Sequence, residues 1–195
     1  MRICVYGASS SNIDEFYIAK TYELGLELAK NGIGMVYGGG MNGLMGAAAR
    51  GMHDGGAEII GVAPTFFKVD GVLYENCTEL IHTQTMRQRK QIMEEKADGF
   101  IVLPGGFGTL DEFFEILTLK QLERHNKPII IFNIKGYYDN LWEFIEFAIT
   151  EGFVKEACKE LTFMTSSPAE LLDYLNQYDP NKVIKTEKLK YIENY

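Results

Sequence analysis

Short apolar runs rich in β-branched and aromatic residues alternate along the chain with segments whose apolar residues recur every three or four positions. Runs of this length and composition are typical of strands. They occupy residues 3–6, 33–37, 58–62, 78–81, 100–103, 128–132 and 161–164. Spacing typical of amphipathic helices is found between them at Ile18, Tyr22, Leu26 and Ala29, and again at Leu110, Phe113, Phe114 and Leu117. The pattern therefore predicts alternating strands and helices.

This alternation predicts an α/β fold of the Rossmann-like, doubly wound type, with a mostly parallel sheet and helices on both faces. The strands are almost continuously apolar, as expected for strands buried on both faces. The chain has 195 residues, of which 46% are hydrophobic, so we expect a single domain with one continuous core. We assign residues 1–179 to this domain and residues 180–195 to a charged C-terminal tail. In such sheets ligands bind beyond the carboxyl ends of the strands.

Charge and rare residues narrow the range of functions. A net charge of −8 argues against a nucleic-acid groove, which needs clustered Lys and Arg, but a few local cations can still hold one phosphate. The three Cys and three His residues show neither a disulfide framework nor metal-binding spacing, so we predict no metal and no cofactor. Without a signal peptide or a stretch of about 20 apolar residues, we expect a cytoplasmic protein with no membrane partner.

Two loops of small residues follow the first two predicted strands. In the first, residues 7–11, Ser9 and its neighbours offer hydroxyls to a phosphate or ribose, although a turn with a serine helix cap explains them equally well. The second matches GxGxxG between a strand and a helix, a pattern that can direct backbone N–H groups at an anion. It adds three candidate ligand-binding residues, Gly38, Gly39 and Gly40.

The third loop carries the strongest local signal. Residues 100–103 form a buried strand, and three glycines follow before an amphipathic helix, as in loops that bind phosphate. We expect Thr109 to cap this helix and to offer its hydroxyl to the phosphate. The candidate phosphate ligands are Gly105, Gly106, Phe107, Gly108 and Thr109.

Neither of the two common nucleotide motifs is complete. An NAD-binding protein needs an acidic residue at the end of the strand after GxGxxG, whereas Glu58 begins that strand. The third loop lacks the Gly-Lys-Ser or Gly-Lys-Thr of a Walker P-loop. NAD binding and ATP hydrolysis are therefore both disfavoured.

Several charged residues flank the third loop. Glu112 follows Thr109 by three positions, so it either closes a capping box or acts on a ligand as a catalytic carboxylate. Before the preceding strand, Arg87, Arg89 and Lys90 form a cationic cluster in an acidic protein. Such clusters are usually solvated, but a guanidinium opposite a phosphate loop can hold phosphate with two hydrogen bonds. The residues alone leave both questions open.

Taken together, these motifs resemble those of the Lonely Guy family of cytokinin riboside 5′-monophosphate phosphoribohydrolases, long labelled as possible lysine decarboxylases. The family signature PGGxGTxxE stands at 104–112, its Arg-Lys pair at Arg89 and Lys90, and its GGGxxGLMG at 38–46. The likeness extends from the first strand to about Leu175. Arg87 is a departure, because many relatives have His at this position.

The resemblance implies a Rossmann-like homodimer with active sites near the interface. It also implies that catalysis depends on Arg89 and Glu112, and that ligand contacts fall on Lys90 and on residues 105–109. Two further contacts, Glu75 and Thr118, are implied in the same way.

These implications lead to a specific expectation for function. The protein should hydrolyse the N-glycosidic bond of an adenosine 5′-monophosphate (AMP), N6-substituted or plain, to free base and ribose 5-phosphate. The main alternative is a nucleotide or molybdenum-cofactor carrier of the same superfamily that performs no hydrolysis. Lysine decarboxylation is disfavoured, because the chain is short for such an enzyme and lacks a recognisable setting for a pyridoxal-phosphate lysine.

Overall fold

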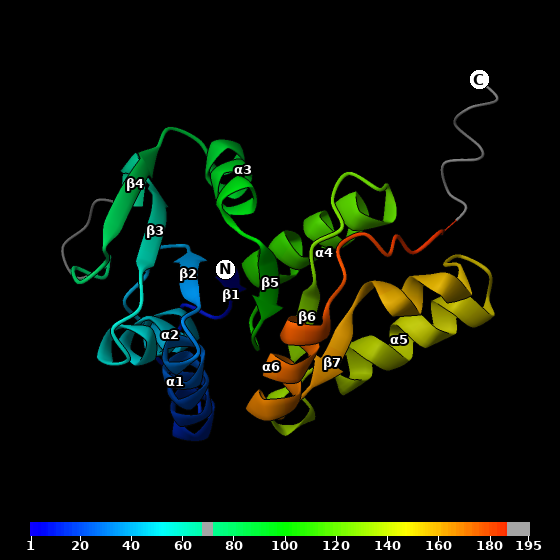
Figure 1. The fold of residues 1–195 in the computed structure, drawn as a ribbon, viewed down its shortest axis with the longest axis horizontal. Coiled ribbons are helices and arrows are strands. Elements are labelled where there is room, and N and C mark those ends of the chain that lie inside the picture. Colours follow the sequence, from blue (N-terminus) through cyan, green and yellow to red (C-terminus); the bar gives the residue numbers. More distant parts are fainter. Residues whose placement is uncertain (68–71, 187–195) are drawn as a thin grey trace.

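The computed structural model describes residues 1–67 and 72–186, and these form an α/β fold (Figure 1). A seven-stranded sheet has the order β4-β3-β2-β1-β5-β6-β7, and every neighbouring pair is parallel. The strands are β1 (Arg2–Tyr6), β2 (Gly34–Tyr37), β3 (Ile59–Pro64), β4 (Glu79–Thr83), β5 (Gly99–Val102), β6 (Ile129–Phe132) and β7 (Phe163–Thr165). The predicted doubly wound, Rossmann-like fold is confirmed, and each predicted apolar run overlaps one strand.

Six α-helices connect or follow the described strands. They are α1 (Glu15–Lys30), α2 (Gly43–Asp54), α3 (Met86–Lys96), α4 (Phe107–Gln121), α5 (Asp139–Thr150) and α6 (Pro168–Gln177). Three short 3-10 helices, η1 (Thr65–Phe67), η2 (Ile134–Gly136) and η3 (Glu156–Leu161), lie in the connections. Side chains cap three of the α-helices: Asp14 accepts from Phe16 N–H, Thr85 from Gln88 N–H, and Ser167 from Glu170 N–H. The suggested serine cap for the first helix is wrong, because Asp14 fills that position.

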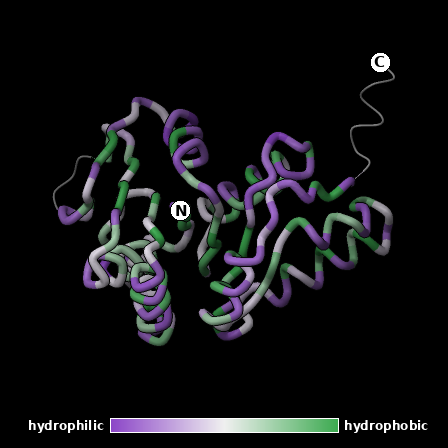
Figure 2. Tube along the Cα trace, viewed as in Figure 1, coloured by the Kyte–Doolittle hydropathy of each residue, from purple (hydrophilic) through white to green (hydrophobic). Residues whose placement is uncertain are grey.

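The alternation of side chains along β1 divides the core between the two faces of the sheet. Ile3 and Val5 pack with buried residues of α1, α2 and α6. Cys4 and Tyr6 pack with buried residues of α3 and α4 on the opposite face. Figure 2 shows hydrophobic residues concentrated along the central strands, whereas α3 is largely hydrophilic. Burial on both faces explains why the central strands are apolar throughout.

The position of β1 between β2 and β5 sets the location of the functional site. The connection after β1 leads to β2 on one side of the sheet, and the connection after β5 leads to β6 on the other side. The two loops therefore diverge at the carboxyl ends of β1 and β5. Such a switch point is where open α/β sheets bind their ligands. The loops after β1, β2 and β5 are the three that the sequence singles out.

The described part of the C-terminal tail lies against the end of α4. Asn126 Nδ2 donates to the carbonyl oxygens of Pro180 and Lys182, and Thr186 Oγ1 donates to the carbonyl oxygen of Gln121. Residues 187–195 of the tail lie outside the described residues. Among the residues described, no helix combines the length and apolar character needed to cross a membrane.

Candidate active site

Three loops meet at the carboxyl edge of the sheet and enclose a cleft of about 600 Å³. Backbone hydrogen bonds tie them together: Ala8 N–H donates to the Pro104 carbonyl oxygen at 3.0 Å, and Leu44 N–H donates to the Ala8 carbonyl oxygen at 2.8 Å. These bonds join the loops after β1, β2 and β5 without using side chains. Several predicted ligand-binding residues line the cleft, namely Ser9, Gly38, Gly40, Gly106, Phe107, Gly108 and Thr109.

The N-terminus of α4 opens into this cleft. The helix begins at Phe107 with Gly106 as its N-cap residue, and no side chain caps it. The expectation that Thr109 caps the helix is therefore wrong, because Thr109 is the third helical residue. Its side chain packs against Gly105, where an added Cβ would lie 2.1 Å from Thr109 Oγ1. Since the first N–H groups of a helix have no intrahelical acceptor, this uncapped end is suited to an anion.

A buried ion pair lies beside this helix end. Arg89 Nη1 is 2.7 Å from Glu112 Oε1, and the two residues are 5% and 8% exposed. Arg89 Nε also donates to the Val62 carbonyl oxygen at 3.0 Å, which fixes the guanidinium. The capping-box alternative for Glu112 does not hold, because its carboxylate bonds to Arg89 and lies six residues into α4. Arg89 and Glu112 both line the cleft.

Gly38 makes room for the guanidinium. A Cβ added at Gly38 would lie 1.9 Å from Arg89 Nη2, far inside contact distance. The glycine that follows β2 and the arginine of α3 therefore depend on each other. Only a residue without a side chain lets Arg89 occupy this position beside Glu112.

Burial sets the electrostatics of the pair. It raises the pKa of the Glu112 carboxyl above its ordinary value, and the Arg89 guanidinium opposes this effect without cancelling it. Moving two charges out of water carries a desolvation penalty that can exceed their mutual attraction, so a buried pair is weak evidence for stability. A perturbed carboxyl in a cleft is instead typical of a functional site.

Apolar side chains form one wall of the same cleft, and the motifs do not identify this wall. The β3–β4 connection is held against the glycine-rich loop, because Tyr74 N–H donates to the Gly39 carbonyl oxygen at 2.9 Å and Met41 N–H to the Val72 carbonyl oxygen at 3.0 Å. The wall consists of Met45, Phe67, Val72, Leu73 and Met86. Four separate segments supply these residues, so no local spacing marks them in the sequence.

A family model described as "Possible lysine decarboxylase" matches residues 45–175. Over 92% of this chain, 41% of residues are identical to the cytokinin riboside 5′-monophosphate phosphoribohydrolase LOG of Oryza sativa subsp. japonica, and the match covers 74% of that protein. A cytokinin riboside 5′-monophosphate phosphoribohydrolase of Arabidopsis thaliana is 39% identical over 92% of this chain and 84% of its own length. The chain belongs to the Lonely Guy family.

Solved structures of more distant proteins share the fold of this Lonely Guy protein. The molybdenum cofactor binding protein of Rippkaea orientalis aligns with a TM-score of 0.69 and 22% identity, over 90% of this chain and 94% of the other. DNA processing protein A of Helicobacter pylori aligns with a TM-score of 0.57 and 14% identity, over 91% and 80% of the two chains. At these identities the likeness concerns the fold alone.

The remaining candidate residues lie outside the cleft lining. Lys90 Nζ is 3.0 Å from Asp111 Oδ2 and 2.6 Å from Glu115 Oε2, so it joins α3 to α4. Glu75 and Thr118 are exposed and do not line the cleft. Gly39 supports the cleft through its backbone, with a φ of 76° that favours glycine, and Gly105 lies just behind the lining. Within the described residues, no group of His, Cys, Asp and Glu is arranged to hold a metal ion.

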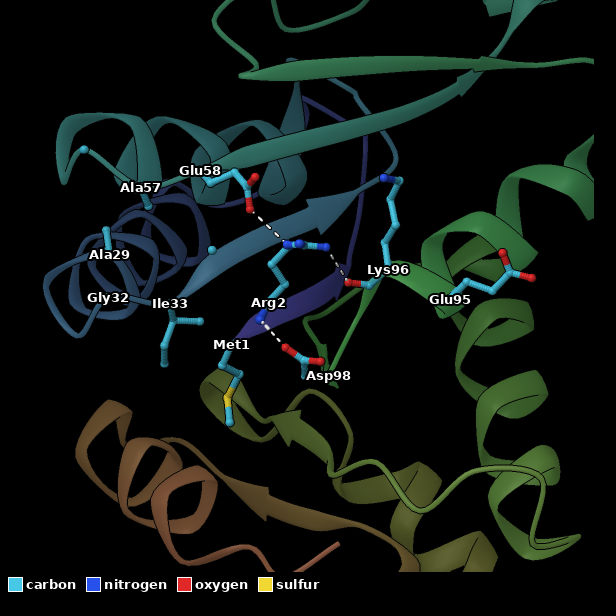
Figure 3. Close-up of a pocket in the computed structure, with 12 residues that line it drawn as sticks. Met1, Arg2, Ala29, Gly32, Ile33, Ala57, Glu58, Glu95, Lys96 and Asp98 are labelled. Atoms are coloured by element: carbon cyan, nitrogen blue, oxygen red, sulfur yellow. Dashed lines mark hydrogen bonds and ion pairs between the residues drawn. The ribbon is translucent and has the colours of Figure 1, made fainter.

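The opposite, amino edge of the sheet has a hollow of about 580 Å³, the amino-edge hollow (Figure 3). Its charges neutralise one another: Arg2 Nε is 2.9 Å from Glu58 Oε2, and Arg2 N–H donates to Asp98 Oδ2 at 2.7 Å. The Arg2 and Glu58 side chains are 41% and 49% exposed. This hollow presents neither an unpaired buried charge nor an open helix N-terminus.

Proposed function

We propose that this Lonely Guy protein hydrolyses the N-glycosidic bond of N6-substituted AMP and releases free base and ribose 5-phosphate. The observation that carries the proposal is the buried Arg89–Glu112 pair beside the uncapped N-terminus of α4. Family relatives that are 39% and 41% identical are named for this activity. Plain AMP is the simplest substrate of the same class.

The geometry supports a specific arrangement of the nucleotide. The 5′-phosphate lies on residues 105–109, where backbone N–H groups and the positive end of the α4 dipole favour an anion. The adenine faces the apolar wall that includes Met45, Leu73 and Met86. The ribose then lies next to Glu112. Ser9, Gly38 and Gly40 border the same space.

The ion pair performs the chemistry in this arrangement. As the glycosidic bond breaks, positive charge develops on the ribose ring and negative charge on the leaving base. The Glu112 carboxylate stabilises the ribose charge and orients the attacking water, while Arg89 orients the phosphate or assists departure of the base. The water supplies a hydroxyl to the ribose and a proton to the base, so the reaction needs no other reactant.

We further propose that the protein forms a homodimer in the cytoplasm. Helix α5 buries none of its residues within the described chain, and Phe144, Phe147 and Phe153 on and after it are 64%, 58% and 85% exposed. Exposed aromatic groups of this kind are typical of an interaction surface. Light scattering of the purified protein tests the dimer, and a Phe147→Asp variant that stays dimeric would exclude this face as the interface.

The activity is tested by incubating the protein with AMP and with N6-isopentenyl-AMP and separating the products by chromatography. We expect free base and ribose 5-phosphate in equal amounts from at least one substrate. Binding without any release of base would contradict the proposal. That result would instead favour the carrier function, which at present rests on structures that share only the fold.

A further inference from the structure

A second hollow of about 210 Å³ lies next to the cleft on the side of α1 and β6. Its lining is mainly apolar and comes from Ile13, Tyr17, Leu44, Pro104 and Tyr137. The two hollows meet at small residues, because Ala8, Ser10 and Gly106 line both of them. The proposed reaction does not use this second hollow.

The meeting point coincides with the N-terminus of α4. Gly106 is the N-cap residue of that helix, and an ideal Cβ built on it would have no atom within 4 Å, so the space beside it is open. A phosphate on this helix end therefore has the cleft on one side and the second hollow on the other. Both hollows are lined by the loops after β1 and β5, at the switch point where doubly wound sheets bind their ligands.

The walls of the second hollow suit an apolar group. Tyr137 OH already donates to the Gly105 carbonyl oxygen at 2.9 Å, so its ring, and not its hydroxyl, is left for a ligand. The rings of Tyr17 and Tyr137 meet edge to face with centroids 6.2 Å apart. Because an apolar cavity of about 150 Å³ accepts benzene, this hollow is large enough for a phenyl ring.

We propose that the second hollow is a subsite for an apolar or aromatic group esterified to the 5′-phosphate of the bound nucleotide. The ligand class is a nucleotide phosphodiester, with its base in the cleft, its phosphate at Gly106 and its second ester group between Tyr17 and Tyr137. This inference rests on the phosphate position in the proposed function. It extends the range of ligands beyond nucleoside monophosphates.

Calorimetry with the full-length Glu112→Gln variant, in which we expect slow cleavage, tests the subsite. The probes are AMP, its methyl ester and its phenyl ester, and the two esters carry the same charge. Burial of the phenyl ring should make the phenyl ester bind about 10- to 100-fold more tightly than the methyl ester. Adding Ile13→Trp, which fills the hollow, should abolish this ratio while the affinity for AMP persists.

A matched change in the opposite wall is the control. Leu73→Phe should alter the affinities of both esters alike and leave their ratio intact. Should Ile13→Trp fail to fold, Tyr17→Ala removes one wall and should lower the affinity for the phenyl ester alone. Equal affinities of the two esters, or a ratio that survives Ile13→Trp, would refute the subsite but not the proposed function. If AMP itself does not bind, both proposals fail.

Discussion

The cleft at the carboxyl edge and the hollow at the amino edge of the sheet have nearly equal volumes, about 600 and 580 Å³. Each holds an Arg–Glu pair at similar distance, 2.7 Å for Arg89–Glu112 and 2.9 Å for Arg2–Glu58. Their exposure separates them, because the side chains of the first pair are 6% and 9% exposed and those of the second 41% and 49%. Neither volume nor charge type distinguishes the candidate active site, whereas burial does.

Burial matters because it changes what a charge can do. Water screens the exposed pair, so its attraction and its effect on a ligand are small. In the cleft the same groups act in a medium of lower dielectric constant, where a fixed carboxylate strongly stabilises a developing positive charge. Equivalent substitutions in the two regions should therefore have different effects.

The largest effect is expected from removing the buried carboxylate. Glu112→Gln keeps the side-chain volume and should keep nucleotide binding, but it should lower turnover about 10²- to 10⁴-fold, since it loses the negative charge beside the ribose. Glu58→Gln is the matched change at the amino edge and should leave turnover unchanged. Steady-state kinetics with AMP or N6-isopentenyl-AMP measures the turnover of both variants. Full activity of Glu112→Gln would show that this carboxylate takes no part in catalysis.

Gly34 in β2 and Gly38 in the loop after it offer the next comparison. Gly38→Ala would place a Cβ 1.9 Å from Arg89 Nη2, so the guanidinium must move; we expect turnover to fall about 10- to 100-fold. At Gly34 the corresponding Cβ would lie 3.2 Å from Cγ of the exposed Arg2 side chain, which can shift. Gly34→Ala should therefore be active. Equal activities of the two folded variants would contradict the positioning of Arg89 by Gly38.

A smaller effect than that of Gly38→Ala is expected on the pH dependence of kcat/KM. Because burial raises the pKa of Glu112, the acid limb of kcat/KM should lie above the ordinary range for a glutamate, with activity lost as the pH falls through that limb. Asp111 contributes to the raised pKa of Glu112, so Asp111→Asn should move the limb to lower pH. Asp98→Asn at the amino edge should leave it in place. If the acid limb does not shift in the Asp111→Asn variant, Glu112 is not the titrating group.

The smallest effect concerns the exposed pair. Breaking Arg2–Glu58 with Arg2→Met should change the free energy of unfolding by at most about 1 kcal/mol, and the change should shrink in high salt. Urea unfolding at low and high ionic strength measures it. A larger, salt-independent loss would mean that the amino-edge pair behaves as a buried one, and the comparison would fail.

The sequence predicts features that depend on local patterns and misses those that depend on distant contacts. Apolar runs locate all seven described strands, and glycines mark the three converging loops, because both signals are local. Thr109 is a good N-cap residue by type, yet α4 begins two residues earlier, at Phe107. The Arg89–Glu112 bond joins residues 23 positions apart, so spacing alone leaves the role of Glu112 undecided. The family resemblance, and not periodicity, identifies this pair.

A crystal structure of the Glu112→Gln variant with bound N6-isopentenyl-AMP tests the central claim most directly. We predict the phosphate at the N-terminus of α4, the ribose C1′ beside residue 112, and the base against Leu73 and Met86. The amino-edge hollow should contain no nucleotide. A nucleotide bound at Arg2 and Glu58, or a phosphate away from residues 105–109, would contradict the account.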